Sequence, residues 1–231
     1  MHVFYINVNV SYESHSRRVR STVAQACPNK ETVVCAHESL HFEPSQRTKA
    51  TYHIWTKMAA TQGNPPLREI FGALQGSWKL HRRLTSVLPG FPSGIFTGTA
   101  TFKPHSAFNK ASYLYLETGE LKTDQGHTLK ANRKYIYRFS AEDEKISVWF
   151  VKEPHAEGEE DVDYLFHELE FEKLDNKWIA KGDHLCDMDM YWALYEFRTE
   201  DTKEDGMKVW GVRYKVKGPQ KDYMSDTAYE R

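Results

Sequence analysis

From residue 77 onward the sequence is a succession of short runs in which apolar and polar residues alternate. A period of two is typical of β-strands, whose successive side chains point to opposite faces of a sheet. About ten such runs follow one another. They are Ser77–Leu84, Ile95–Phe102, Ala111–Thr118, His127–Lys130, Arg133–Phe139, Lys145–Val151, Tyr164–Phe171, Lys177–Lys181, His184–Phe197 and Lys208–Val216.

Turn-forming residues separate most of these runs, and the connections have the length of hairpin loops. No helical period interrupts the series, which favours an antiparallel meander over a parallel sheet. A meander of this length closes most simply into an up-and-down barrel, because closure removes exposed strand edges. We therefore predict an all-β domain over residues 68–231, an antiparallel barrel of about eight to ten strands that can hold one small ligand.

The residues just before the first run predict a short helix. Asn64 and Pro65 are typical of a helix start, and Gly76 is typical of the position just after a helix end. Between them lies an apolar stripe with helical spacing, which consists of Leu67, Ile70, Phe71 and Leu74. We expect this helix to plug one end of the barrel; a lid over a pocket is the alternative.

Residues 1–57 have a different character. They contain seven Lys and Arg against four Glu, five of the eleven His, and little periodicity. We predict a disordered extension here, and an organelle-targeting arm is the alternative. Three cysteines (Cys27, Cys35 and Cys186) are an odd number and make no disulfide framework, which favours a reducing, cytoplasmic compartment.

The overall charge gives no attraction to polyanions. With 31 basic and 32 acidic residues the net charge is −1, so we expect neither nucleic acid nor an anionic membrane as a partner. No apolar run approaches the roughly 20 residues of a membrane span. The expected partner is a small molecule, and the sequence leaves the oligomeric state open.

Chemically capable side chains concentrate in residues 183–195. As a single strand, strict alternation would separate His184 and Cys186 from Asp189 and Tyr191. A β-bulge near Asp187 would instead direct all four into the barrel, and we expect such a bulge because the Asp-Met-Asp-Met run breaks the alternation.

A second inward His is expected upstream. Leu165, His167, Leu169 and Phe171 alternate with acids and share the apolar face of one run. His167, His184, Cys186 and Asp189 are acceptable ligand types for zinc or iron, and His167 or His184 could ligate haem. Cys186, two residues from His184, resembles a nucleophile with a base. No second pair at a diagnostic spacing supports these hypotheses, so we predict no metal and no cofactor, with haem or metal at His167 or His184 as the minor alternative.

Two arginines are expected on inward faces, Arg82 beside Trp78 and Arg133 beside Tyr135. A buried Arg is costly unless it is paired. The pattern therefore predicts either a carboxylate-bearing ligand or internal partners such as Asp189 or Glu117. The tail, residues 221–231, is expected to be a strap across the barrel, with pocket closure by Lys221, Tyr223 or Arg231 as the alternative.

Two motifs carry a family resemblance. Gly76-Ser77-Trp78 resembles the Gly-x-Trp signature of calycin (lipocalin-type) barrels, in which a late Arg packs on the Trp; Arg213 or Arg231 would play that part. The pattern His184-x-Cys186-x-x-Asp189-x-Tyr191, with Gly218-Pro219 and the Tyr-rich tail, resembles an uncharacterised family of calycin-like domains. The resemblance covers about residues 70–231 and implies a calycin-like fold, without an established activity.

The function predicted from these residues is binding of a small, partly apolar, anionic organic molecule inside the barrel. The alternative is a cofactor-free acid–base enzyme of isomerase, dehydratase or cyclase type, with His167, Asp189 and Tyr191 as catalytic residues beside Arg133. The predicted ligand-binding residues are Trp78, Arg82, Arg133, Tyr135, His167, His184, Cys186, Tyr191, Arg213 and Lys221.

Overall fold

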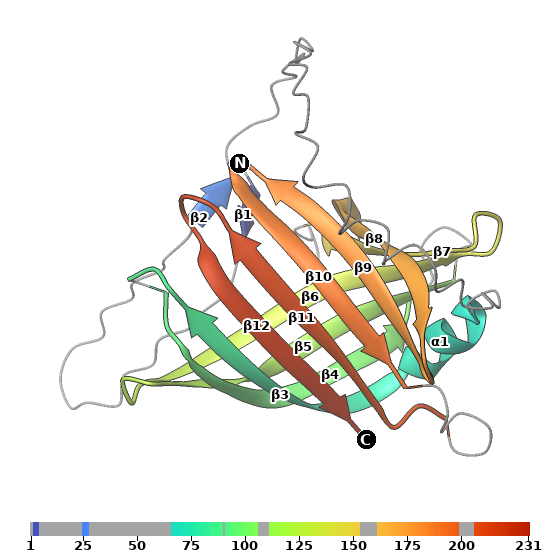
Figure 1. Ribbon diagram of the computed structural model, residues 1–231, viewed down its shortest axis with the longest axis horizontal. Helices are drawn as coiled ribbons and strands as arrows, with labels where there is room; N and C mark the ends of the chain where they lie inside the picture. Colours follow the sequence, from blue (N-terminus) through green and yellow to red (C-terminus); the bar gives the residue numbers. More distant parts are fainter. Residues whose placement is uncertain are drawn as a thin grey trace, which may run out of the picture.

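The computed structural model describes residues 2–4, 25–27, 66–89, 91–105, 111–152, 161–198 and 206–231. One short helix precedes ten strands that close into an antiparallel barrel (Figure 1). The elements are α1 (Leu67–Leu74), β3 (Gly76–Ser86), β4 (Gly94–Pro104), β5 (Ala111–Thr123), β6 (Thr128–Ser140), β7 (Lys145–Val151), β8 (Val162–Leu174), β9 (Lys177–Cys186), β10 (Asp189–Phe197), β11 (Val209–Lys217) and β12 (Asp222–Glu230).

Each barrel strand pairs with the next one along the chain, and β12 pairs with β3 to complete the ring. The prediction of an all-β, up-and-down antiparallel barrel with a short helix before its first strand is therefore confirmed. Two further strands, β1 (His2–Phe4) and β2 (Gln25–Cys27), pair with each other in a separate sheet. The predicted disordered extension and the proposed helix start at Asn64 otherwise fall on residues outside the described ranges.

Two predictions of strand boundaries were wrong. The run at 184–197 is not one strand, because Asp187 and Met188 form a turn between β9 and β10, with Asp187 in the left-handed region at φ 56°. Asp tolerates that conformation better than most residues, since its short side chain bonds locally. In contrast, the runs at 127–130 and 133–139 are one continuous strand, β6.

The C-terminal tail is a barrel strand, which corrects the expected strap. β12 lies between β11 and β3 and pairs with both along nearly its whole length. Its sequence has the necessary alternation, since Ser225, Thr227 and Tyr229 are buried inside the barrel while the residues between them are more exposed. Without this strand the sheet would keep two open edges.

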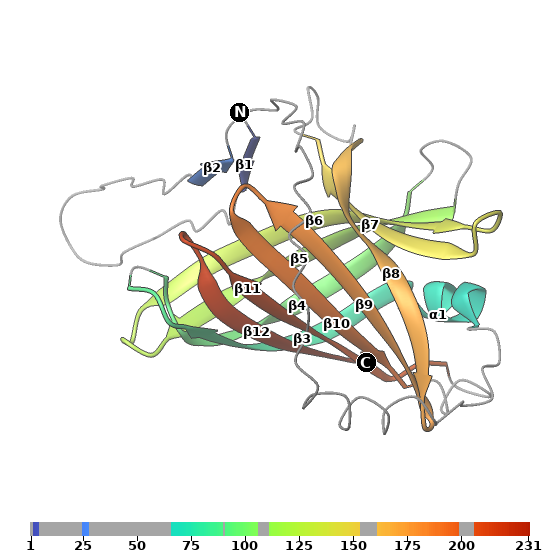
Figure 2. The same ribbon diagram turned by 45° about the horizontal axis from the view of Figure 1, so that its top comes forward.

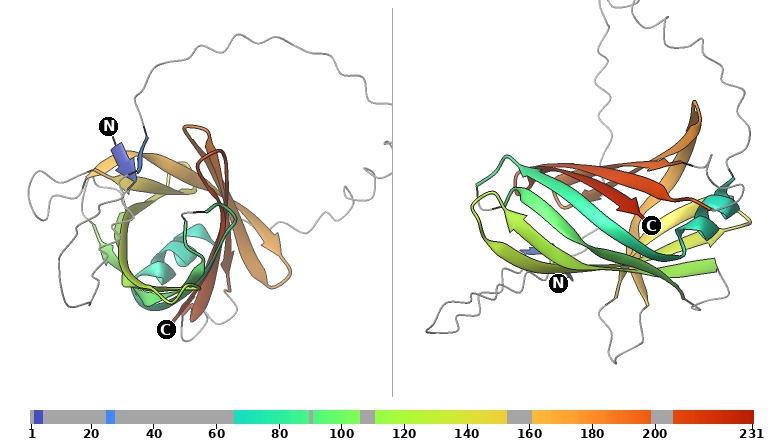
Figure 3. Two further views of the ribbon diagram at one scale, coloured as in Figure 1. Left: turned by 90° about the vertical axis from the view of Figure 1, so that its left-hand side faces the viewer. Right: turned by 90° about the horizontal axis from the view of Figure 1, so that it is seen from below.

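The helix closes one end of the barrel, as expected (Figures 2 and 3). Its apolar stripe is buried, and Phe71 stacks on Tyr113 of β5 and Phe139 of β6 with ring centroids 4.5 and 5.7 Å apart. The indole nitrogen of Trp78 donates to the Leu74 carbonyl at 2.8 Å, which ties the helix end to β3.

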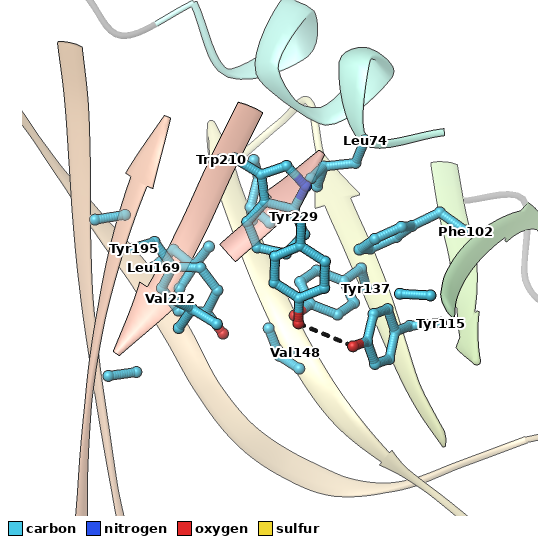
Figure 4. Packing of buried hydrophobic residues seen from close by; sticks show 14 of the residues in the cluster. Leu74, Phe102, Tyr115, Tyr137, Val148, Leu169, Tyr195, Trp210, Val212 and Tyr229 are labelled. Carbon is cyan, nitrogen blue, oxygen red and sulfur yellow. Dashed lines mark hydrogen bonds between the residues drawn. The ribbon is translucent and has the colours of Figure 1, made fainter. Parts of the chain in front are cut away.

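Aromatic side chains fill the interior next to the helix (Figure 4). Trp210 stacks on Tyr229 at 3.8 Å with nearly parallel rings, and Trp78 meets Trp210 edge to face at 6.1 Å. Phe102 completes the group through edge contacts with Trp210 and Tyr115. These large rings bury much apolar area, so this half of the barrel is its hydrophobic core.

Arg231 holds the helix end of the barrel together. Its guanidinium lies 4.1 Å above the Trp78 ring and donates to the carbonyls of Ala73, Gln75 and Met207 at 2.8–3.0 Å. Of the two arginines considered for the Trp contact, Arg231 therefore occupies that place. One planar side chain joins the last turn of α1, the first barrel strand and the segment before β11.

Replacing Arg231 by Met is expected to lower the free energy of unfolding by about 1–3 kcal/mol, because three carbonyls lose a charged donor and Trp78 loses its cation. Urea denaturation at neutral pH measures this. Arg213→Met is the matched control, since the exposed Arg213 pairs only with Asp226 among the contacts described and such pairs contribute under about 1 kcal/mol. Equal losses of unfolding free energy in the two variants would contradict this stabilising role of Arg231.

Candidate functional site

The barrel interior has two unlike halves. Next to α1, the inward side chains are buried on nearly every strand. In the other half, inward side chains remain partly exposed although they lie on the inner wall of a closed barrel. They include Leu129, Ala131, Arg133, Tyr135, His184, Tyr214 and Tyr223. An inward residue of a closed sheet can meet solvent only inside the barrel or through an opening in its wall or end. Water therefore reaches the interior in the half away from the helix.

A buried ion pair marks the boundary between the two halves. The guanidinium of Arg82 donates to both carboxylate oxygens of Glu117 at 2.6 Å and, through Nε, to the Thr227 hydroxyl at 2.8 Å. Both charged residues are at most 5% exposed. Bidentate pairing of this kind allows an Arg side chain to be buried, because a buried charge or N–H group without a partner would lower the stability of the fold.

Glu117 is ionised despite its burial. Burial alone would raise its pKa, but the charge of Arg82 and its hydrogen bonds, then Arg133 and the Tyr115 hydroxyl, outweigh that effect and lower the pKa to about 2. Tyr115 donates to the carboxylate at 2.6 Å and shares a 2.9 Å hydrogen bond with the Tyr229 hydroxyl. The carboxylate oxygens are thus largely occupied by internal donors.

Arg133 is the second interior cation. It faces Glu117 directly in the β5–β6 register, but its Nε lies 4.0 Å from the nearer carboxylate oxygen, beyond hydrogen-bonding distance. Its side chain is 21% exposed, so it borders the half of the interior that water reaches. Among the described residues its guanidinium makes no hydrogen bond to a protein acceptor. Arg82 and Arg133 against Glu117 leave one positive charge in excess.

His167 belongs to a chain of hydrogen-bonded side chains inside the barrel. Its Nε2 lies 2.9 Å from the Tyr195 hydroxyl, which in turn lies 2.8 Å from the Tyr214 hydroxyl. Burial, and to a smaller extent the nearby His184, lower the pKa of His167 to about 3. The imidazole is therefore neutral at neutral pH and acts as a hydrogen-bonding partner of Tyr195.

The strand that carries His167 departs from strict alternation. Register shifts against β7 place both Phe166 and His167 in the buried interior, whereas Leu165 is 36% exposed on the outside. The expectation that Leu165 shares the inward face with His167 was therefore wrong, because a bulge turns the strand between them. Phe166 takes the inward place, stacking on Tyr135 at 5.6 Å and on Tyr214 at 5.9 Å.

His184, Cys186, Asp189 and Tyr191 all lie on the inner wall at the end away from α1. The β9–β10 hairpin, and not a bulge, brings them together: Asp189 pairs with Cys186, and Tyr191 with His184. The Cys186 side chain is buried. Burial is also the largest cause that lowers the pKa of His184 and raises that of Tyr191.

Asp189 holds loops in place. Its Oδ1 accepts hydrogen bonds from the backbone N–H groups of Gln220 and Lys221 at 3.1 and 3.2 Å, and its Oδ2 lies 3.3 Å from the Lys221 ammonium. A Cβ at Gly218 would lie 2.2 Å from the same carboxylate, so only glycine fits there. The Lys221 ammonium also lies 5.5 Å from the centre of the Tyr191 ring.

The other predicted residues are spread over three environments. Trp78 is in the packed core next to α1, whereas Tyr135 lines the wet half. Arg213 lies on the outer face of β11, since its neighbours Val212 and Tyr214 point inward. Sequence reasoning missed Phe166 and Tyr214 as interior residues, although the alternation of Tyr214 with charged neighbours on β11 was a usable signal.

Residues 74–231, more than half of the chain, match the model of DUF6314, described as a family of unknown function. The chain belongs to the DUF6314 family. The matched region begins at the last residue of α1 and contains all ten barrel strands, so the DUF6314 domain coincides with the closed barrel. A comparison with curated proteins found no match.

The described part of this DUF6314 protein contains no group of three or more His, Cys, Asp and Glu side chains that could hold a metal ion. Ligation of haem by a single His is a different arrangement and stays a hypothesis. Within the same described ranges, no helix is long and apolar enough to cross a membrane.

We predict that Glu117→Gln lowers the free energy of unfolding by about 3–5 kcal/mol, because it leaves the Arg82 charge buried without a counter-ion. The double variant Arg82→Met/Glu117→Gln should recover most of this loss, since it removes both charges. Urea unfolding at pH 7 of the two single variants and the double variant measures the coupling. Additive losses would show that the pair does not act as a unit.

His167 predicts a specific pH dependence. Its folded pKa lies below the ordinary value of 6.5, so the unfolded chain binds a proton first and stability falls as pH drops from about 6.5 toward about 3. Between pH 7 and 5, above the range of most carboxylates, the loss from this residue should be about 2 kcal/mol.

His167→Gln should remove that part of the pH dependence, whereas His81→Gln on the exposed outer face of β3 should keep it. Unfolding free energies at pH 7, 6 and 5 give the comparison. If the unfolding free energy of His167→Gln falls as steeply between pH 7 and 5 as that of the unmodified protein, the buried, neutral state of His167 is contradicted.

Proposed function

We propose that this barrel binds a small organic molecule with an apolar, aromatic-sized body and one anionic group, and that Arg133 holds the anion. The observation that carries the proposal is the contrast between the two interior arginines. Arg82 has its acceptors within the protein, at 2.6–2.8 Å, whereas Arg133 has no hydrogen-bond acceptor among the described residues and is open to solvent inside the barrel.

Electrostatics supports an anionic ligand. The interior has one positive charge in excess near Arg133, because Glu117 is shared by two arginines and the neutral His167 adds no charge. Asp189 and Lys221 balance each other at the far end. An uncompensated guanidinium in a partly dry space attracts a carboxylate, sulfonate or phosphate more strongly than one in bulk water would.

The walls around Arg133 suit an apolar body. Phe166 stacks on Tyr135 at 5.6 Å and on Tyr214 at 5.9 Å, and Leu129, Ala131 and Tyr223 add apolar surface to the lining. Such walls supply contact area to a planar or branched hydrocarbon group, while a small number of polar groups set its orientation.

Catalysis is not part of the proposal. Asp189 accepts two backbone hydrogen bonds and forms an ion pair with Lys221, whereas His167 is buried against Tyr195, six residues further along β10. These contacts give Asp189 and His167 separate partners within the protein. The enzyme alternative stays a hypothesis that no contact in the described residues favours.

The test uses two fluorescent probes of similar shape. The anionic probe is 1-anilinonaphthalene-8-sulfonate, and N-phenyl-1-naphthylamine lacks its sulfonate. Arg133→Met should weaken the sulfonate probe by about 10- to 100-fold, the equivalent of one charge-assisted hydrogen-bonded contact, and should leave the neutral probe nearly unchanged. Fluorescence titration measures both affinities.

Arg213→Met is the matched control, because it removes an arginine from the outer face of the same barrel. It should change neither affinity. Equal weakening of both probes by Arg133→Met would indicate a general loss of structure, and no binding of either probe by the unmodified protein would overturn the proposal.

A further inference from the structure

Barrel strands extend beyond their partner at more than one place, as β6 does at Thr128–Lys134 beside the shorter β7, and β8 and β9 likewise pair over only part of their length. β8 and β9 pair only from Glu170↔Lys181 to Leu174↔Lys177, five residue pairs next to the helix end. Beyond them, Val162–Leu169 pairs only with β7 and Gly182–Cys186 only with β10, as far as the described strands go. Figure 2 shows β8 bending away from β9 above their paired part.

Side chains, and not backbone hydrogen bonds, fill this gap. The His184 ring of β9 lies 5.3 Å from Phe166 and 6.0 Å from Tyr164 of β8. Closer to the paired part, His167 lies against Gly182, where an added Cβ would come within 2.5 Å of the imidazole. Rings thus take the place of the hydrogen-bonded ladder between these parts of β8 and β9.

A contact made by rings opens at a lower cost than a strand ladder. Separating paired strands breaks several backbone hydrogen bonds at once, whereas this gap is bridged by ring contacts and by the hydrogen bond of the His184 side chain with the Phe166 backbone. Register shifts at Val148/Trp149 and Trp149/Val151 interrupt the ladder on the β7 side of β8 as well. The gap is therefore a place where the wall opens at a lower cost than at a full strand ladder.

The two sides of the gap suit a partly apolar molecule. On the outside, Leu165, Leu185 and Trp192 are 36%, 63% and 44% exposed on β8, β9 and β10. On the inside, Phe166 leads directly to Tyr135, the neighbour of Arg133 on the inner face of β6. An apolar path thus joins the outer surface to the interior cation.

We infer that the gap between β8 and β9 is the passage through which the ligand reaches Arg133. The inference rests on the proposed binding function. The competing route is the end of the barrel away from α1, where Phe91 stacks on Tyr223 at 4.7 Å with nearly parallel rings, and where Asp189 ties down the β11–β12 loop.

A covalent bridge across the gap tests the passage. Leu165→Cys and Leu185→Cys are made together in a background where Cys27, Cys35 and Cys186 are Ser, and a short bis-maleimide then joins the two outer positions. Stopped-flow fluorescence with 1-anilinonaphthalene-8-sulfonate gives the association and dissociation rate constants before and after bridging. Both should fall at least tenfold while their ratio, the Kd, stays within about twofold, because a passage changes the barrier and not the bound state.

The control bridge joins Glu170→Cys and Lys181→Cys, a pair already held in the β8–β9 ladder, and should leave both rate constants unchanged. Unchanged rates in the Leu165/Leu185 bridge, together with faster rates in Phe91→Ala, would overturn the inference in favour of the barrel end.

A second variant covers the case in which the bridged protein does not fold. Tyr164→Ala removes a ring from the gap and should raise both rate constants several-fold with little change in Kd. An effect on the dissociation rate alone, or no effect, would overturn the passage. Failure of the unmodified protein to bind the probe would instead overturn the proposed function, and this inference with it.

Discussion

The arrangement of the interior depends on the buried carboxylate of Glu117. Its bidentate bond to Arg82 joins β5 to β3 over the inner face of β4, and the Tyr115 and Tyr229 hydroxyls extend that network to β12, the strand that closes the ring. A buried ion pair of this kind contributes less to stability than to the choice of one arrangement, since its desolvation offsets much of its attraction. The network separates a packed aromatic half from a half that admits water.

Alternation alone was sufficient to predict the fold and much of the inner wall. Wherever the chain keeps a strict period of two, as in Trp78–Leu84 or Tyr135–Phe139, the predicted inward residues are the inward ones. The errors fall where local backbone geometry changes the period. A left-handed Asp187 makes a two-residue turn inside an apparent strand, and the bulge in β8 moves Leu165 outward. Neither event alters composition, so neither is visible in the pattern of apolar residues.

The distinction between Arg82 and Arg133 was also beyond the sequence. Both alternate with apolar or aromatic residues, and both satisfied the expectation of an inward arginine with either a ligand or an internal partner. The sheet register decides between those outcomes: Arg82 on β3 reaches both oxygens of Glu117 over the inner face of β4, while Arg133, adjacent to Glu117 in the register, is left 4.0 Å from the nearer one. A difference of about 1 Å in position thus separates an arginine hydrogen-bonded within the protein from the one that we propose to hold an anion.

The contacts that stabilise the barrel are concentrated in the half next to the helix. The helix end carries the stacked Trp210 and Tyr229, the buried face of α1 and the Arg231 clamp, and these contacts suffice to hold a small closed sheet together. Stability is a property of the whole cooperative unit, so the opposite half can retain features that would otherwise be costly. These features are the Arg133 guanidinium, which bonds no protein acceptor among the described residues, partly exposed rings, and a stretch of wall without a hydrogen-bonded ladder. Local departures from good packing and pairing are expected at functional sites, where they are offset elsewhere in the structure. In this barrel those departures occur together, on the side of Glu117 away from the helix, and their coincidence is the strongest physical reason to regard that half as the binding half.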